Sequence, residues 1–397
     1  MRKLPKEIWI VGAKRTPFGK MSGAFKSLSA TELGVVAAQA AIAQSGVEPH
    51  DFDHVLLGNV LQTSPDAAYA ARHIGLACGL PIETPALVLN RLCGSGFQAV
   101  ISAAEQILLD QASAVLAVGA ENMTQAPHVM YGLRDGQRFG QPPKVRDSLV
   151  DVLTDSRGPT PMGITAENLA AKYDITREDS DAYALQSQRR WAAADAAGAF
   201  DEELVAVEVP GRKGPVRVER DEHPRPETTA AQLAKLPPVF KKDGIVTAGS
   251  SSGICDGAGA LVVVDGAWGK ERGLKPLAKL LQWGVAAVEP TIMGIGPAPA
   301  IRTALTRAGL SVDAIGLFDV NEAFAAQFLA VQRELELPND RTNVNGGAIA
   351  LGHPLGATGA RITANVLYTA RRRGDGLAVG SACIGGGQGI AVVLELS

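Results

Sequence analysis

The sequence predicts a layered α/β fold made of two similar halves, the first of which carries a large insertion. The tetrapeptide Leu-Ala-Val-Gly at residues 116–119 recurs letter for letter at 377–380. A Gly-x-Gly-apolar strand follows the second copy closely, at 387–394, whereas its counterpart in the first half, 257–264, comes far downstream. Chance similarity between apolar strands is the alternative, but the shared follow-on favours duplication. Residues from about 121 to 250 are therefore predicted to interrupt the first half, and alternating strands and helices imply stacked layers.

The two halves begin with a similar order of elements. In the first half we expect a strand at 8–11, an Ala-rich helix at 30–45 that Gly46 ends, and a strand at 55–57. In the second half the prediction is a helix, its terminating glycine and a strand: Ile301–Ala308, Gly309 and Leu317–Val320.

A strand-to-helix turn in the first half carries a cysteine. The apolar run Ala86–Leu89 reads as a buried strand, and residues 97–109 show helical periodicity, so Cys93 lies between the two. Free amide groups and the helix dipole at such a turn lower the pKa of a thiol. The small residues at 94–96 leave room for a substrate or another backbone. Taken alone, a buried structural cysteine is the better interpretation.

The predicted insertion differs in character from the two halves. Residues 176–179, Thr-Arg-Glu-Asp, form a capping box at the start of a helix that runs to about Ala197. Charged loops at 212–225 and the turn-rich segment 236–238 follow. We therefore expect a lid or a ligand-binding excursion rather than core.

Composition bounds the class of protein. The 397 residues predict two or three domains, and 46% hydrophobic and 20% charged residues are ordinary for a soluble globular chain. A net charge of -3 argues against a nucleic-acid partner, and no apolar run is long enough to span a bilayer. The segment before the first strand is too short for a targeting peptide, so a cytoplasmic location is expected. The cysteines have no CxxC spacing, which argues against zinc and disulfides and for a reducing compartment: Cys78, Cys93, Cys255 and Cys383.

Two polar segments follow predicted strands of the second half. Asn321 and Glu322 come directly after the strand at 317–320, where they would form a helix N-cap with an acidic first turn, or place an amide on a water or substrate oxygen. His353 lies in the glycine-rich segment 343–356 before a helix of small residues. A general base is plausible there, a metal ligand is not, and the glycines match neither phosphate-binding motif.

A second cysteine follows the repeated strand. Cys383 precedes the glycines 385–387, so it occupies a Gly-rich turn at a strand end, as Cys93 does in the other half. A buried core cysteine is again the simplest interpretation. A pseudo-twofold axis between the halves would instead bring both thiols to one site.

Together these segments resemble the signature blocks of the thiolases, in that family's order and spacing, along essentially the whole chain: 90–96, 321–324, 345–354 and 383–387. Within the family, residues 235–243 and 292–297 are most similar to the mitochondrial-type 3-ketoacyl-CoA thiolases. The resemblance implies a duplicated five-layered α-β-α-β-α fold with a loop-domain insertion in the first half. The implied division is an N-terminal half at 1–122 completed by 251–272, an inserted coenzyme A-binding loop domain at 123–250, and a C-terminal half at 273–397.

The resemblance also implies a mechanism. Cys93 would take the acyl group as a thioester, with His353 as the base that activates it. Cys383 would be the second acid/base, which protonates the departing enolate or removes an α-proton in condensation. One oxyanion hole would consist of His353 and a water held by Asn321, the other of the N–H groups of Cys93 and Gly385.

Coenzyme A contacts come from the same resemblance. Arg225 and Thr228 would face its nucleotide, Ser252 would bond the pantetheine arm, and Phe240 would pack nearby. The alternatives are a solvated charge for Arg225 and a turn residue for Ser252. No permanently bound cofactor and no metal are implied, because coenzyme A and acyl-CoA enter as substrates.

Two departures from the family pattern bear on specificity. Residues 248–253 read Ala-Gly-Ser-Ser-Ser-Gly where the family usually has Ala-Gly-Asn-Ala-Ser-Gly. Biosynthetic acetoacetyl-CoA thiolases tend to carry a histidine where this chain has Pro161, before Met162. That difference favours the degradative branch and fatty acid β-oxidation.

The expected activity is thiolytic cleavage of 3-ketoacyl-CoA to acetyl-CoA and a shortened acyl-CoA, or the reverse condensation of two acetyl-CoA. The alternative is a strict acetyl-CoA acetyltransferase. A ketoacyl synthase acting on acyl-carrier protein is disfavoured by Cys383 and the insertion, and a non-catalytic acyl-CoA-binding relative by the presence of Cys93, His353 and Cys383 together. The family implies homo-oligomers, dimers or tetramers built on the N-terminal halves.

Overall fold

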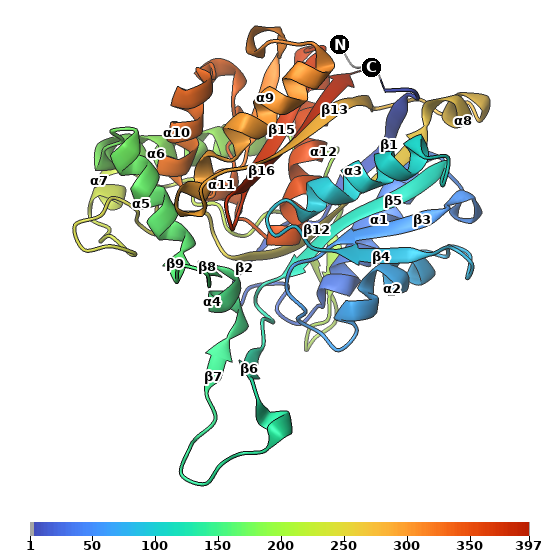
Figure 1. The fold of residues 1–397 in the computed structure, drawn as a ribbon. Coiled ribbons are helices and arrows are strands. Elements are labelled where there is room, and N and C mark those ends of the chain that lie inside the picture. The colour runs from blue at the N-terminus through green and yellow to red at the C-terminus, as the bar shows by residue number, and fades with distance from the viewer. Residues whose placement is uncertain (1–3, 397) are drawn as a thin grey trace.

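The fold is organised around one mixed sheet in which the two halves of the chain mirror each other. The computed structural model describes residues 4–396, and Figure 1 shows its elements. The main path of the sheet runs in the order β14-β15-β16-β13-β1-β12-β5-β3-β4, and β2 pairs with β12. Its strands are β1 (Ile8–Arg15), β2 (Gly19–Lys20), β3 (His54–Gly58), β4 (Ala86–Leu89), β5 (Ala114–Asn122), β12 (Cys255–Asp265), β13 (Ala278–Ala287), β14 (Leu317–Val320), β15 (Leu377–Ile384) and β16 (Gln388–Leu396).

The strand pairing follows the repeat seen in the sequence. The two Leu-Ala-Val-Gly copies lie in β5 and β15, and each strand pairs antiparallel with the Gly-x-Gly strand of its own half, β12 or β16. Each also has a parallel neighbour, β3 or β14. The halves meet where β1 pairs antiparallel with β13. The turn after β4 meets the end of β15 in the other half, because a Cβ on Gly94 would lie 2.6 Å from Ile384 Cδ1.

Helices of the two halves complete five layers. The first half contributes α1 (Ala30–Ser45), α2 (Ala70–Ala77), α3 (Ser95–Leu108) and α8 (Gly266–Glu271); the second contributes α9 (Pro297–Ala308), α10 (Ala325–Leu335), α11 (Ala348–Leu351) and α12 (Leu355–Arg373). Buried side chains of α1 and α2 cover the outer face of the first half-sheet, and those of α9 and α10 cover the second. Between the half-sheets, α3 and α12 share a third core. The five-layered fold expected from the sequence is confirmed.

The two central helices approach so closely because they cross at glycines. A Cβ on Gly359 of α12 would lie 2.1 Å from the backbone nitrogen of Phe97 in α3. Residues 355–370 of α12 are all buried. The backbone of α12 is therefore fixed against both half-sheets, and so is the start of the helix, which follows His353.

Strand β4 differs from the expectation of a buried strand. It lies at one end of the main sheet path, paired only with β3 among the described residues, and Leu87 is 49% exposed. The residue pattern of an apolar strand is the same whether the strand is covered by the rest of the chain or lies at a sheet edge. Burial was therefore predicted wrongly here, although the strand itself is present.

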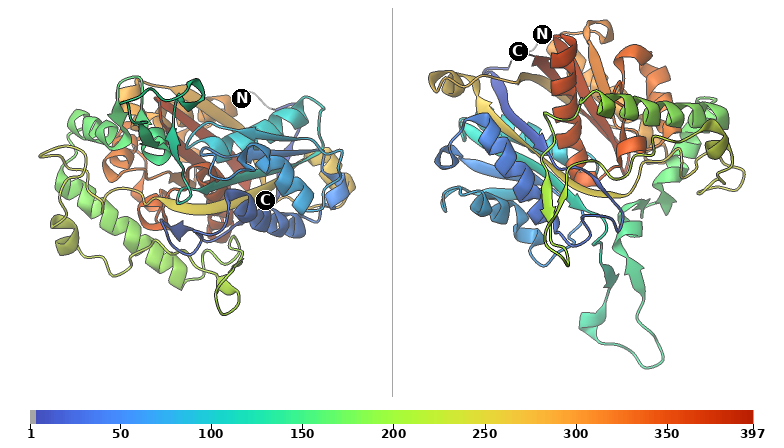
Figure 2. Two further views of the ribbon diagram at one scale, coloured as in Figure 1. Left: turned by 90° about the horizontal axis from the view of Figure 1, so that it is seen from below. Right: turned by 180° about the vertical axis from the view of Figure 1, so that it is seen from behind.

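The insertion packs beside the second half and also projects from the body. Its elements are β6 (His128–Met130), β7 (Val145–Asp147), α4 (Ser148–Val152), β8 (Thr154–Asp155), β9 (Thr160–Pro161), α5 (Met162–Lys172), α6 (Arg177–Ala196), β10 (Val207–Val209), β11 (Val216–Val218) and α7 (Ala230–Ala234). The expected capping box starts α6, with Thr176 as N-cap and the Asp179 side chain accepting from the Thr176 N–H. Strands β6 and β7 form an arm that extends away from the layers in Figures 1 and 2. No helix within residues 4–396 is long and apolar enough to cross a membrane.

Candidate active site

Cys93 lies on a tight turn that delivers it to the start of α3. Leu92 adopts a φ of 48°, in the left-handed region. The Ser95 hydroxyl braces this turn, because it accepts from the Arg91 N–H at 2.8 Å and donates to the Leu92 carbonyl at 2.7 Å. Helix α3 follows with Gly94 as its N-cap. The strand-turn-helix placement expected from the sequence is therefore present.

The electrostatics of Cys93 differ from the expectation. Burial raises the pKa of its thiol to about 11, although the N–H groups of Gly385 and of Cys93 itself approach the sulfur and lower it. Desolvation of a thiolate outweighs the amide groups of a helix start when both act on one sulfur. The thiol is therefore protonated at rest, and its activation requires a base.

His353 is held as a neutral imidazole. Its Nδ1 lies 2.6 Å from the Thr358 hydroxyl, which donates its own proton to the Pro354 carbonyl at 2.9 Å. The hydroxyl oxygen is thus left to accept, so Nδ1 carries the hydrogen and Nε2 keeps a free lone pair. Burial and the nearby Arg361 lower the pKa of His353 to about 3. This is the protonation state that a general base needs.

Asn321 meets His353 from the other side. It follows β14, and its N–H donates to the Ser381 carbonyl at 2.9 Å, which ties it to β15. Its side-chain nitrogen lies 3.4 Å from His353 Nε2, and its Oδ1 is buried without a protein partner. A buried amide oxygen without a partner is suited to receive a hydrogen bond from water or substrate.

Cys383 approaches from the second half at the end of β15. Its side chain is fully buried. Burial is the main cause that raises the pKa of its thiol, and the neighbouring Cys93 raises it further. The turns that carry the two cysteines are neighbours, since the Arg91 guanidinium donates to Gln388 Oε1 at 3.3 Å. Gly385, two residues after Cys383, directs its N–H at the Cys93 sulfur.

A small apolar cavity opens beside these groups. It has a volume of about 160 Å³, and its lining includes His353, Ser252, Phe240, Met162 and Leu355. The Ser252 N–H donates to the Ala323 carbonyl at 2.9 Å, which joins this loop to the segment that carries Asn321. Two of the residues expected to contact coenzyme A, Ser252 and Phe240, thus lie next to the candidate base.

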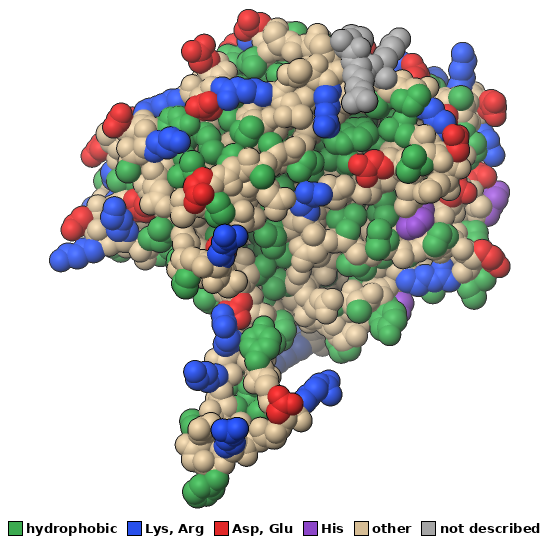
Figure 3. Space-filling model, viewed as in Figure 1, with side chains coloured by type: hydrophobic (Ala, Val, Ile, Leu, Met, Phe, Trp, Pro, Cys, Tyr) green, Lys and Arg blue, Asp and Glu red, His purple; other side chains and the backbone are tan. Residues whose placement is uncertain are grey.

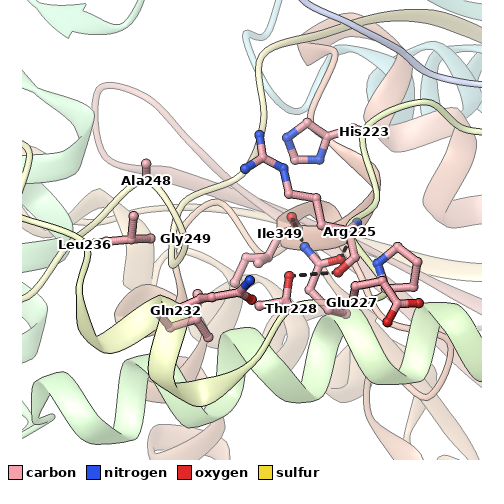
Figure 4. Close-up of a pocket in the computed structure, with 12 residues that line it drawn as sticks. His223, Arg225, Glu227, Thr228, Gln232, Leu236, Ala248, Gly249 and Ile349 are labelled. Carbon is pink, nitrogen blue, oxygen red and sulfur yellow. Dashed lines mark hydrogen bonds between the residues drawn. The ribbon is translucent and has the colours of Figure 1, made fainter.

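Arg225 and Thr228 line a different and larger pocket of about 490 Å³. Figure 4 shows them on one loop, where the Thr228 hydroxyl donates to the Arg225 carbonyl at 2.7 Å. Arg225 itself is exposed. The four residues predicted to contact coenzyme A are therefore divided between two cavities, one lined by the candidate base His353 and one lined mostly by residues of the insertion.

Sequence reasoning misjudged or missed three residues here. Glu322 is not in the first turn of a helix, because α10 begins at Ala325 with Phe324 at its N-cap position. Thr358 and His223 were not singled out. Thr358 had a signal, a hydroxyl shortly after the histidine at a helix start. His223 lines the larger pocket and approaches the Ala350 carbonyl with Nδ1 at 2.7 Å, a contact that no local pattern predicts.

No group of histidine, cysteine, aspartate and glutamate within the described chain is arranged to hold a metal ion. The chemistry available at the site consists of two thiols, one neutral imidazole, an amide and backbone N–H groups. Such a set suits acyl transfer through a thioester.

Comparisons with known proteins assign the family. Models of the thiolase N-terminal and C-terminal domains match residues 8–267 and 274–396. A mitochondrial 3-ketoacyl-CoA thiolase of Mus musculus is 55% identical over 388 residues, 98% of each chain. An acetyl-CoA acetyltransferase of Chromobacterium violaceum is 47% identical over 390 residues, 98% of this chain and 99% of the relative. A crystal structure of human mitochondrial 3-ketoacyl-CoA thiolase in complex with CoA superimposes with a TM-score of 0.97 at 52% identity, covering 100% of this chain and 99% of that one.

The chain therefore belongs to the thiolase family. The family, the fold and the enzyme class expected from the sequence, an acyltransferase, are confirmed, and the similarity supports thiolase activity and coenzyme A binding. The expected cytoplasmic location is wrong by the same comparison, since relatives from mouse, human and rat at 53–55% identity are mitochondrial proteins. Cysteine spacing reports on the redox environment, which does not by itself distinguish compartments.

Proposed function

We propose that the chain catalyses reversible thiolysis of 3-ketoacyl-CoA by coenzyme A, giving acetyl-CoA and an acyl-CoA shortened by two carbons, through an acyl-Cys93 intermediate. The observation that carries this proposal is the meeting of the Cys93 turn with the turn after β15. A Cβ on Gly94 would lie 2.6 Å from Ile384 Cδ1, and one on Gly385 would lie 3.2 Å from Leu92 Cδ1. The Gly385 N–H approaches the Cys93 sulfur. His353 and Asn321 supply the neutral base and the free amide oxygen beside them.

The first half-reaction replaces the C2–C3 bond of the substrate by a bond between C3 and the Cys93 sulfur. His353 takes the thiol proton, and the Cys93 sulfur attacks the 3-keto carbon of the substrate. The bond between C2 and C3 then breaks, and its electron pair leaves as the enolate of acetyl-CoA. Cys383 protonates the enolate carbon, so that acetyl-CoA departs and the acyl group remains on Cys93. Coenzyme A then gives its thiol proton to the Cys383 thiolate, and its sulfur attacks the thioester carbon. The bond between that carbon and the Cys93 sulfur breaks, the Cys93 thiolate takes back the proton from His353, and the shortened acyl-CoA leaves.

Both half-reactions develop negative charge on a carbonyl oxygen, so each needs preorganised hydrogen-bond donors. The N–H groups of Cys93 and Gly385 would stabilise the tetrahedral oxyanion at the acyl carbon. His353 and a water on Asn321 would stabilise the enolate oxygen, because Nε2 can donate a hydrogen bond once it has received the thiol proton.

We propose that residues 123–250 form the coenzyme A-binding loop domain, bounded by the two parts of the first half. Arg225 and Thr228 would contact the nucleotide in the larger pocket, while Ser252 and Phe240 would contact the pantetheine arm where it enters the smaller cavity. Coenzyme A is thus a substrate, and the reaction requires no permanently bound cofactor.

A degradative role is supported by Pro161 and by the relatives. The mouse and human relatives named above are mitochondrial 3-ketoacyl-CoA thiolases, which supports a mitochondrial location and a place in fatty acid β-oxidation. Strict acetyl-CoA acetyltransferase activity is the second candidate, because bacterial relatives with that name are 45–47% identical. The two candidates differ in whether the apolar cavity accepts an acyl chain longer than acetyl.

A homo-oligomer, a dimer or tetramer, is also proposed. Within the described residues strand β4 pairs only with β3 and exposes Leu87, and the arm between β6 and β7 carries exposed Tyr131 and Phe139. Figure 3 shows Lys and Arg side chains around the same arm. Exposed apolar edges and aromatic residues on a projecting arm are features of subunit contacts.

The test is thiolysis of acetoacetyl-CoA and of a longer 3-ketoacyl-CoA, measured side by side with and without iodoacetamide pretreatment. Activity on both that is lost after alkylation supports a broad-range thiolase. Activity on acetoacetyl-CoA alone supports the acetyltransferase. Absence of thiolysis with both substrates would contradict the proposed function.

A further inference from the structure

Glu322 is a buried carboxylate that no step above uses. Its Oε1 accepts from the Tyr183 hydroxyl at 2.6 Å and from the Asn343 amide at 3.3 Å. Its Oε2 accepts from the Ser187 hydroxyl at 2.7 Å and from the Ile349 N–H at 3.1 Å. A buried carboxylate is stable only with such a full set of donors, so these contacts are expected to form together.

The donors come from three segments that are far apart in the sequence. Tyr183 and Ser187 are on α6 of the insertion, and Ile349 is on α11, which leads through Gly352 to His353. The loop that precedes α11 packs against the Glu322 carboxylate at Gly347, where a Cβ would lie 2.4 Å from the carboxyl carbon. Glu322 thus joins the insertion to the segment that carries the candidate base, and Asn321 is its neighbour in the chain.

The same segment is also held from the larger pocket. Gln188, next to Ser187 on α6, accepts from the Arg225 N–H at 2.9 Å and donates to the Ile349 carbonyl at 3.3 Å. Ile349 therefore has its carbonyl held by a residue of the pocket and its N–H held by Glu322. Arg225, Gln188 and Ile349 all line that pocket, as Figure 4 shows for Arg225 and Ile349.

We propose that Glu322 is a positioning residue that couples occupancy of the pocket around Arg225 to the placement of His353 and Asn321. This inference rests on the proposed function, since the pocket is taken to hold the nucleotide of coenzyme A. A nucleotide that fixes the Arg225 loop also fixes Gln188 and, through it, α11. Because Glu322 binds α11 and adjoins Asn321, it then fixes the positions of His353 and Asn321. Remote binding energy is then used in the chemical step, where a misplacement of about 1 Å costs on the order of 100-fold in rate.

Two variants disturb the junction with little change in volume. Glu322→Gln keeps the shape, but its amide nitrogen cannot accept, so one pair of donors loses its acceptor. Tyr183→Phe removes one hydroxyl and keeps the ring, which stacks on Phe328 with centroids 4.4 Å apart. If Glu322→Gln fails to fold, Tyr183→Phe remains as the variant to test.

The chain offers a matched control. Tyr173 also donates its hydroxyl to a glutamate, Glu334, at 2.8 Å. That pair joins the end of α5 to α10, and within the described residues neither side chain hydrogen-bonds to the 343–353 segment. Tyr173→Phe therefore removes an equivalent hydrogen bond without touching the proposed coupling.

The measurement is the saturating single-turnover rate of acyl transfer to Cys93 from acetoacetyl-CoA and from acetoacetyl-pantetheine, which lacks the nucleotide. We expect the wild type to react faster with acetoacetyl-CoA. Glu322→Gln and Tyr183→Phe should reduce this rate ratio by about tenfold, a magnitude typical of coupling between sites. Tyr173→Phe should keep the wild-type ratio.

The outcomes separate the two proposals. A wild type that transfers no acyl group from either substrate contradicts the proposed function itself. A wild type that is active but shows equal rates with both substrates overturns the coupling. So does an unchanged ratio in both junction variants, even if both rates fall equally, because that result indicates a structural role alone.

Discussion

Thr358 fixes the tautomer of His353. The hydroxyl lies 2.6 Å from Nδ1 and donates its own hydrogen to the Pro354 carbonyl, so it accepts the hydrogen bond from Nδ1. The lone pair of the imidazole is therefore on Nε2, which faces Asn321. A base whose free nitrogen is preset does not have to reorient during the reaction.

Thr358→Val keeps the volume and removes this acceptor. We expect kcat for thiolysis to fall by about 10- to 100-fold, because the imidazole then populates the wrong tautomer and orientation. Steady-state thiolysis of acetoacetyl-CoA measures the change. The control is Thr363→Val on the same helix, whose hydroxyl donates to the Gly359 carbonyl at 2.7 Å and has no contact with His353 in the structure. Equal losses in both variants would contradict a role for the tautomer.

Cys383→Ala should reduce thiolysis by about 10²- to 10⁴-fold, because the enolate of acetyl-CoA loses its proton donor. Alkylation of Cys93 by iodoacetamide should persist in this variant, which shows that the fold and the nucleophile are intact. Cys78→Ala is the control, since Cys78 lies at the end of α2, away from the site. Full activity of Cys383→Ala would instead favour the ketoacyl synthase type of mechanism.

The buried imidazole of His353 predicts a specific pH dependence of stability. Its pKa falls from 6.5 in the unfolded chain to about 3 in the fold. Between these values the unfolded state binds the proton and the folded state does not, so stability is lost as pH falls below about 6.5 and the loss ends near 3.

The change from pH 7 to pH 4.5 should cost about 2.5 kcal/mol through this group alone, at 1.36 kcal/mol per unit of pKa shift. Urea unfolding of the wild type and of His353→Asn at both pH values isolates it, because the other groups titrate in both proteins. The stability of the variant should fall less on acidification. Parallel losses in the two proteins would show that His353 does not contribute.

Phe139 on the projecting arm tests the proposed oligomer. The side chain is fully exposed in the single chain, as are its neighbours on the loop. Phe139→Asp should shift the assembly towards a smaller species in light scattering after size-exclusion chromatography. Gln137→Asp adds the same charge in the same loop and should leave the assembly unchanged. An unchanged mass for Phe139→Asp would contradict the proposal that the arm takes part in the subunit contact.

Much of the fold was predictable because the signals were local or repeated. The helix of residues 30–45 has its capping box and its terminating Gly46, and the structure reproduces its bounds. The duplicated tetrapeptide predicted the symmetry of the sheet, because its two copies form the equivalent strands β5 and β15. Burial of β4 was not predictable, because an edge strand and a covered strand can carry the same apolar letters.

The site was predictable where a residue type announced its chemistry, as the two cysteines and His353 did. Its protonation states were not. The helix start at Cys93 suggested a lowered pKa, whereas burial raises it, and the extent of burial depends on the other half of the chain. Glu322 was also beyond local reasoning, because its donors lie up to 139 residues away in the chain.

The central claim is that Cys93 carries the acyl group, and mass spectrometry tests it directly. The protein is mixed with acetoacetyl-CoA in the absence of free coenzyme A, quenched in acid and digested. We predict one acetyl group on the peptide that contains Cys93, its release as acetyl-CoA when coenzyme A is added, and no such adduct in Cys93→Ser. An acetyl group on Cys383 in place of Cys93, or steady thiolysis by Cys93→Ser, would contradict the account.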